Sequence, residues 1–153
     1  MLKNIFIGVL TSLAISQVSL ATVQDNDPLH LAGTYQCHGY DSHDGDYKDA
    51  TVKLILDAKH SDFSHHYGAY HFQLIEPNGI LQYTGEAAAS GNHLAIYFKS
   101  ISTATTHDEG VGIAAVTHSK DKQGKVTTIF EKFYYEPDYQ GGGNGFETCI
   151  KKI

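Results

Sequence analysis

The sequence predicts an all-β protein, an eight-stranded antiparallel up-and-down barrel closed by a disulfide between Cys37 and Cys149. Three observations support this prediction. Short segments of alternating polar and apolar residues follow one another from residue 32 onward, and no segment after residue 21 shows the 3.6-residue apolar period of a helix. The two cysteines lie near opposite ends of the chain. A two-sheet β-sandwich is the alternative architecture that the same pattern allows.

Eight segments have the alternation and the flanking turn residues that strands require. Residues 47–57 are the clearest case, because Val52, Leu54 and Leu56 share one face while Lys53 lies on the other. Glycine, asparagine and proline separate the segments, and such short links favour antiparallel neighbours. The eight predicted strands are residues 32–40, 47–57, 67–76, 80–89, 93–100, 110–118, 126–135 and 146–152.

The cysteines distinguish a closed sheet from an open one. A disulfide needs Cα atoms within about 6 Å. In a flat open sheet of eight strands, the first and last strands would be more than about 30 Å apart. A closed barrel puts them side by side and removes both exposed sheet edges. The bond would also close a loop of over a hundred residues, which the chain-entropy model values at roughly 4–5 kcal/mol.

The N-terminal residues 1–21 have the layout of a secretory signal peptide. Lys3 supplies the positive end, an apolar run follows, and the small residues Ser19 and Ala21 occupy the cleavage positions. We therefore expect cleavage after Ala21 and a secreted or periplasmic protein, a compartment in which disulfides form. Residues 22–31 are expected to be an N-terminal extension and residues 32–153 a single domain.

The composition limits the kind of partner. After Ala21 the chain keeps ten lysines, no arginine and seventeen acidic residues, a formal charge of −7. This argues against nucleic acid, which requires clustered Lys or Arg. No second apolar run could span a membrane. A small molecule or a basic protein is the expected partner. Ten histidines also make the charge sensitive to mild acid, because an unperturbed histidine titrates near pH 6.5.

Two family resemblances refine this picture. The segment LAGTYQCHGYD at residues 31–41 and the hairpin pattern of residues 83–98 resemble the calycin group, the avidin and lipocalin type of small barrel. That resemblance implies a ligand cavity and names no ligand. Gly33-Thr34-Tyr35 stands where the group often has Gly-x-Trp, and this chain contains no tryptophan.

A second resemblance is to the small periplasmic inhibitors of c-type lysozyme. Tyr35-Gln36-Cys37 and Cys149 match the cysteine layout of that family, and residues 89–92 are similar to its inhibitory loop. Carried over, the resemblance implies that Ser90 and Lys99 enter the cleft of a basic target enzyme, which an acidic inhibitor would attract electrostatically.

No catalytic signature is present, so the expected function is non-enzymatic binding at the open end of the barrel. The aromatic segment around residues 133–139 and the glycine-rich loop 141–145 are expected at the barrel mouth. Tyrosines there would suit a ligand site, because a tyrosine side chain can stack on a ligand. The acidic segment 41–46 does not fit the EF-hand ligand pattern. It is expected to be a solvated turn, with a looser calcium site as the alternative. The predicted ligand-binding residues are Tyr135, Tyr139, Asn144 and Phe146.

A histidine-rich segment, residues 60–66, supports metal binding as a further alternative. Along a straight strand His65 and His71 would be about 20 Å apart, too far for one ion. His71 is expected to point outward. A curled loop would allow His60, Asp62, His65 and His66 to offer ligands to Zn or Cu.

Overall fold

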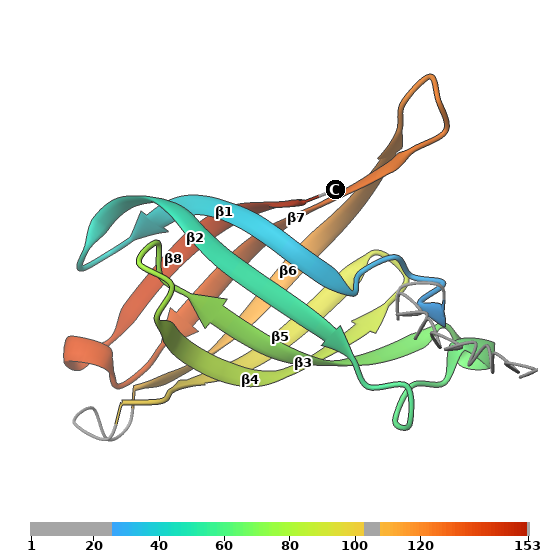
Figure 1. The fold of residues 1–153 in the computed structure, drawn as a ribbon. Helices are drawn as coiled ribbons and strands as arrows, with labels where there is room; N and C mark the ends of the chain where they lie inside the picture. The colour runs from blue at the N-terminus through green and yellow to red at the C-terminus, as the bar shows by residue number, and fades with distance from the viewer. Residues whose placement is uncertain (1–25, 103–107, 153) are drawn as a thin grey trace, which may run out of the picture.

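A computed structural model describes residues 26–102 and 108–152, so the predicted signal peptide lies outside the described residues. The chain forms a closed antiparallel barrel in which each strand pairs with the next and β8 returns to pair with β1 (Figure 1). The strands are β1 (Gly33–Asp41), β2 (Gly45–Leu56), β3 (Tyr67–Ile75), β4 (Leu81–Ser90), β5 (His93–Ser100), β6 (Glu109–Lys120), β7 (Val126–Glu136) and β8 (Gly143–Lys151). Two short 3₁₀ turns, η2 (Phe63–His65) and η3 (Tyr139–Gly141), lie in the connections.

The closure of the barrel confirms the predicted fold class and the predicted disulfide. Cys37 on β1 lies directly opposite Cys149 on β8, with their Cα atoms 4.1 Å apart. Because the two strands are hydrogen-bonded along their length, the sheet has no open edge at this seam. The sandwich alternative does not apply.

The predicted strands are all present, with one boundary that differs notably. β8 begins at Gly143 rather than at residue 146, so part of the expected glycine-rich loop is strand. Gly143 pairs with Glu136 on β7, and Gly145 pairs with both Tyr134 on β7 and Asp41 on β1. A side chain at Gly145 would collide with the Tyr134 hydroxyl. Glycine is needed there for close packing inside the barrel.

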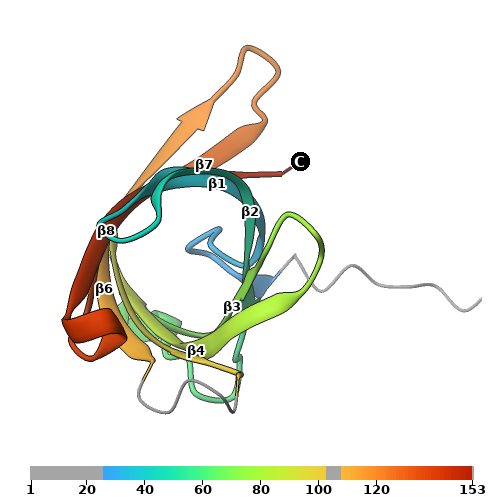
Figure 2. The ribbon, with the colours of Figure 1, turned by 90° about the vertical axis from the view of Figure 1, so that its left-hand side faces the viewer.

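One end of the barrel is closed by the segment that precedes β1. Figure 2 shows this segment, in blue, across the far end of the barrel. The carboxylate of Asp27 holds it in place, because it accepts hydrogen bonds from the backbone N–H of Leu29 (3.1 Å) and Ala32 (2.6 Å) and from the Tyr70 hydroxyl (2.9 Å). The Tyr35 hydroxyl donates to the Leu31 carbonyl at 2.6 Å. The predicted N-terminal extension therefore ends in a plug.

The apolar core fills the half of the barrel next to this plug. Its largest fully buried apolar side chains are Leu31, Tyr35, Val52, Leu54, Tyr70, Phe72, Leu94 and Phe130. The connections at the other end, 42–44, 76–80 and 137–142, surround an opening that faces the viewer in Figure 2. The hairpin of β6 and β7 projects beyond the plugged end (Figure 1). Within the described ranges, no helix is long and apolar enough to cross a membrane.

Removing the disulfide should destabilise the protein. Replacing both cysteines with alanine releases the constraint on a segment of 112 residues in the unfolded chain, and the free energy of unfolding should fall by roughly 4–5 kcal/mol. Urea denaturation of the oxidised wild type and the Cys37→Ala/Cys149→Ala variant measures the difference. A loss below about 1 kcal/mol would show that strand pairing alone holds the seam.

Candidate functional site: a polar cavity at the open end

The open half of the barrel contains a cavity of about 270 Å³. Its walls combine aromatic side chains, among them Phe72, Tyr83 and Phe98, with charged ones from β7 and β8. The interior therefore changes character along the barrel axis, from an apolar core beside the plug to a mixed polar and aromatic chamber at the mouth.

A buried ion pair forms the floor of the cavity. The Lys132 ammonium lies 2.5 Å from Glu147 Oε1, and the two side chains are 2 % and 0 % exposed. The other carboxylate oxygen, Oε2, accepts a hydrogen bond of 2.8 Å from the Tyr47 hydroxyl. Buried charges are costly unless they are paired and hydrogen-bonded. Here the Lys132 ammonium pairs with Oε1, which accepts no hydrogen bond from the described residues, and Tyr47 hydrogen-bonds Oε2.

Three aromatic rings surround the ammonium of this pair. Lys132 Nζ lies 5.0 Å from the ring centroid of Tyr134, 5.3 Å from that of Phe72 and 5.4 Å from that of Phe98. The negative faces of aromatic rings attract cations at such distances. The three rings therefore form an aromatic cage of the kind that binds cations, and the Lys132 ammonium occupies it.

Asp41 forms one side of the mouth. Its Oδ2 accepts a hydrogen bond of 2.9 Å from the Tyr134 hydroxyl, and its Oδ1 accepts the backbone N–H groups of His43 (2.8 Å) and Asp44 (3.2 Å). Asp41 is 7 % exposed, whereas Asp44 and Asp46 are exposed. The acidic segment is therefore only partly the solvated turn that the sequence predicted, because Asp41 alternates into the barrel with Cys37.

Glu136, at the end of β7, is the buried carboxylate of the cavity that has no partner in the described part of the chain. It is 4 % exposed, and neither a hydrogen bond nor an ion pair joins its carboxylate to any residue that the structure describes. Burial raises its pKa to about 7, and the nearby carboxylates of Asp41 and Asp108 add to the increase. Near neutral pH this carboxyl group is therefore divided between its protonated and ionised forms.

The tyrosine hydroxyls of the cavity remain neutral donors. Burial, reinforced by neighbouring carboxylates, raises the pKa of Tyr47, Tyr83 and Tyr134 far above its ordinary value. The Tyr83 hydroxyl donates to both oxygens of Asp108, at 3.2 and 3.1 Å. These donors hold carboxylates in fixed positions around the mouth.

Of the four ligand-binding residues predicted from the sequence, the structure places only Tyr139 at the cavity. Its hydroxyl donates to Asp44 Oδ2 at 3.5 Å across the mouth. Asn144 is exposed, and Tyr135 and Phe146 are 48 % and 60 % exposed on the outer face of β7 and β8. Phe146 stacks there against Tyr40, with ring centroids 5.8 Å apart. A ligand in the cavity would not contact these three.

The two residues implied by the lysozyme-inhibitor resemblance lie far apart along the barrel. Ser90 ends β4 beside the turn to β5 at the plugged end, and Lys99 lies near the opposite end of β5, both exposed. Six residues of strand from His93 to Lys99 correspond to about 20 Å. Ser90 therefore lies beside a turn and Lys99 on the strand that follows it, as the resemblance implies.

The four predicted metal ligands also divide into separate groups. His65 Nδ1 contacts Asp62 Oδ2 at 2.7 Å, whereas His60 Nδ1 contacts Asp57 Oδ2 at 2.6 Å. His66 is exposed, with a left-handed backbone at the end of η2. His71 is exposed, as expected, and lies 3.0 Å from Glu86 Oε2. These pairs do not form a shared site for one ion.

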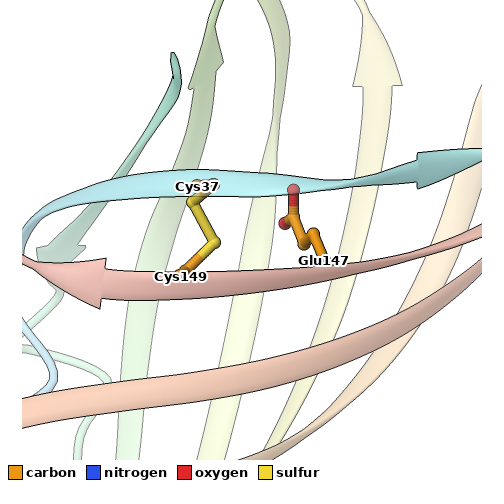
Figure 3. Close-up of side chains that lie close together, drawn as sticks. All are labelled: Cys37, Glu147 and Cys149. Carbon is orange, nitrogen blue, oxygen red and sulfur yellow. A yellow bond between two sulfur atoms is a disulfide. The ribbon is translucent and has the colours of Figure 1, made fainter. Parts of the chain in front are cut away.

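In the described part of the chain, a single group of three ligand-type side chains comes within 4.8 Å of one another: Cys37, Glu147 and Cys149. Figure 3 shows that the two sulfurs are bonded to each other and that Glu147 projects beside them from β8. Disulfide sulfurs are not thiolates and do not bind zinc. The group therefore is not a metal site in the oxidised protein.

Apart from Tyr139, the residues that define the cavity were not predicted, although the sequence contained a signal for them. Side chains alternate along a strand, so Glu147 shares a face with Cys149, and Lys132 and Glu136 share one with Phe130. If the disulfide faces inward, Glu147 must do so too. The aromatic residues Phe133 and Tyr135 then face outward. This arrangement is the reverse of the usual one, in which apolar side chains are buried and charged side chains are exposed.

Comparisons with protein-family models, curated proteins and solved structures found no match to this chain. What can be said of its site therefore comes from the geometry of the barrel.

Breaking the buried ion pair should be costly. Lys132→Met leaves the Glu147 carboxylate buried without its counter-ion, and the free energy of unfolding should fall by about 3–5 kcal/mol. Adding Glu147→Gln should recover part of this loss, because the uncompensated charge is then gone. Urea denaturation at pH 7 measures both effects, with Lys99→Met on the exposed face of β5 as the control. Equal losses in the single and double variants would contradict this account.

The unpaired Glu136 should make stability fall as pH rises. Its pKa is about 7 in the folded protein against an ordinary 4.5, so the folded state holds the proton more tightly. The contribution of Glu136 to stability should therefore decrease between about pH 4.5 and 7. Glu136→Gln should raise the free energy of unfolding by up to about 3 kcal/mol at pH 8 and have little effect near pH 4.5.

Urea denaturation at pH 4.5 and pH 8 tests this dependence. Glu131→Gln, the same change at an exposed position of β7, is the control and should leave stability nearly unchanged at both pH values. A Glu136→Gln variant that is destabilised at pH 8 would show that the carboxylate has a stabilising partner.

Proposed function

We propose that this protein is a non-enzymatic binding protein that holds a small organic molecule in the cavity at the open end of its barrel. The observation that carries the proposal is the chamber of about 270 Å³ with converging polar groups. Ligand sites are typically concave and aromatic with a few placed polar groups, and Tyr83, Tyr134 and Glu136 have these roles here.

The size of the chamber favours a ligand of about one ring. Drug-sized ligands occupy pockets of roughly 300–1,000 Å³, and this chamber lies just below that range. The plug at Asp27 and the apolar core limit its depth. A long lipid chain would need the core to be displaced.

The barrel topology supports the calycin-type resemblance as part of the same proposal. Small closed eight-stranded barrels can hold one small ligand in their interior, and this chain has the strand number and order of such a barrel. The family itself rests on the resemblance of residues 31–41 and 83–98.

The composition of the cavity wall does not match that of a serine- or cysteine-dependent enzyme. Among the described residues that line it, there is no serine, threonine, cysteine or histidine, the residues from which such an enzyme builds its nucleophile and base. The disulfide and the N-terminal segment support a secreted or periplasmic location.

A fragment screen by two-dimensional NMR tests the proposal. A library of single-ring compounds of positive, neutral and negative charge is added to the ¹⁵N-labelled protein, and shifted backbone amides are mapped. We expect shifts to cluster at Ala50, Phe72, Phe98 and Tyr134, which line the cavity. If no compound shifts these amides, the proposal fails.

A pair of matched variants strengthens the screen. Ala50→Leu adds bulk inside the cavity, and Ala115→Leu makes the same change at an exposed position of β6. The affinity of any compound that binds should fall at least about tenfold with Ala50→Leu and stay unchanged with Ala115→Leu. Equal affinity in both variants would place the bound compound outside the cavity.

A further inference from the structure

The charged groups of the cavity are strongly unbalanced. Five carboxylates line it, from Asp41, Asp44, Glu76, Glu136 and Glu147, against the ammonium groups of Lys48 and Lys132. Lys132 is already paired with Glu147, and Asp41 is held by the Tyr134 hydroxyl and by the turn. The remaining buried charge is the Glu136 carboxylate, so an entering molecule meets a negative chamber.

The surroundings of Glu136 leave its carboxylate accessible from the cavity. Its pairing partner on β8 is Gly143, and a Cβ atom built at Gly110 on β6 would lie 2.8 Å from Glu136 Cγ. Both neighbours on the sheet are therefore glycines, which offer no side chain to bond the carboxylate. A ligand that supplies a donor would form a charge-assisted hydrogen bond with this carboxylate, which no described side chain offers.

The aromatic wall beside this carboxylate suits the rest of a cationic ligand. The Phe98 ring contacts those of Tyr83, Phe72 and Tyr134, with centroids 5.5, 6.2 and 6.1 Å away. Three of these four rings already surround the Lys132 ammonium. Rings arranged in this way can hold both an apolar ring and a positive charge.

We propose that the ligand is an organic cation, a primary or secondary amine on a small apolar body, with its ammonium bound to the Glu136 carboxylate and its body against Phe98 and Tyr83. This inference rests on the function proposed above. An anionic ligand would have to displace Glu147 from Lys132 and approach Asp41 and Glu136, which repel it.

Binding should then depend on pH. The charged and titratable groups around Glu136 are Asp41 and Asp44 at the end of β1, Asp108 before β6 and Lys132 on β7, and all but Lys132 favour its protonation. A bound ammonium favours the ionised carboxylate. Amine binding below about pH 7 should therefore release a proton, and affinity should fall as the pH is lowered from 8 to 5.5.

The experiment uses three molecules of similar shape: 2-phenylethylamine, which is cationic, 2-phenylethanol, which is neutral, and 3-phenylpropanoate, which is anionic. Isothermal titration calorimetry at pH 8 and pH 5.5 measures the three affinities for the wild type. We expect the amine to bind at least about tenfold more tightly than the alcohol at pH 8, with that advantage reduced at pH 5.5, and the anion to bind most weakly.

Glu136→Gln and Glu131→Gln provide the matched test of the anchor. Glu136→Gln should weaken amine binding at pH 8 by about tenfold or more, because it removes a charge-assisted hydrogen bond, and should leave alcohol binding unchanged. Glu131→Gln should change neither. The urea denaturation of Glu136→Gln at pH 8 shows whether the variant is folded, and it is expected to be the more stable protein at that pH.

The outcomes separate this inference from the proposed function. The cation inference fails if the alcohol binds as tightly as the amine, or if Glu136→Gln keeps the amine affinity, and in both cases the barrel remains a ligand-binding protein. It also fails if none of the three molecules binds while other fragments shift the cavity amides. Both proposals fail together only if no fragment of any charge reaches the cavity.

Discussion

The pairing of β1 with β8 is the constraint on which the rest of the structure depends. Once Cys37 lies opposite Cys149, the two-residue alternation of each strand decides which side chains face the interior. Asp41 follows on the same side of β1, and Glu147 and Gly145 follow on the same side of β8. A slip of one residue would turn Glu147 out to solvent and Phe146 inward. The closure therefore determines both the stability and the chemistry of the chamber.

The interior combines two solutions to the problem of filling a small barrel. Near the plug, large side chains such as Tyr35, Tyr70 and Phe130 pack together and exclude water. Near the mouth, Lys132 and Glu147 are buried as a pair, which is rarely more stable than a well-packed apolar alternative. The apolar half and the disulfide supply the stability that the polar half lacks.

The environment of the cavity is the basis of the proposal that its ligand is positively charged. Aromatic rings and carboxylates both attract cations, and the chamber has both in excess over its ammonium groups. Lys132 shows that the cavity wall suits a positive charge, because three aromatic rings and one carboxylate surround its ammonium group. Glu136 differs from the other carboxylates in that nothing in the described chain bonds it, so its charge remains open to a ligand.

The features that could be predicted from the sequence alone are those that depend on interactions between residues close together in the chain, or on the single disulfide. The strands, their turns and the closed barrel follow from local alternation and from one disulfide, because each is a short-range pattern or a single geometric constraint. The ligand-binding residues were predicted mainly from the aromatic content of one segment, and only Tyr139 lines the cavity. Tyr135 and Phe146 occupy the alternate positions of their strands, whose side chains face outward. The pairing of Lys132 with Glu147 and the isolation of Glu136 between two glycines were decided by the tertiary structure alone. Both features depend on the register between neighbouring strands. The sequence of one strand does not determine which residue of the next strand lies beside each of its own.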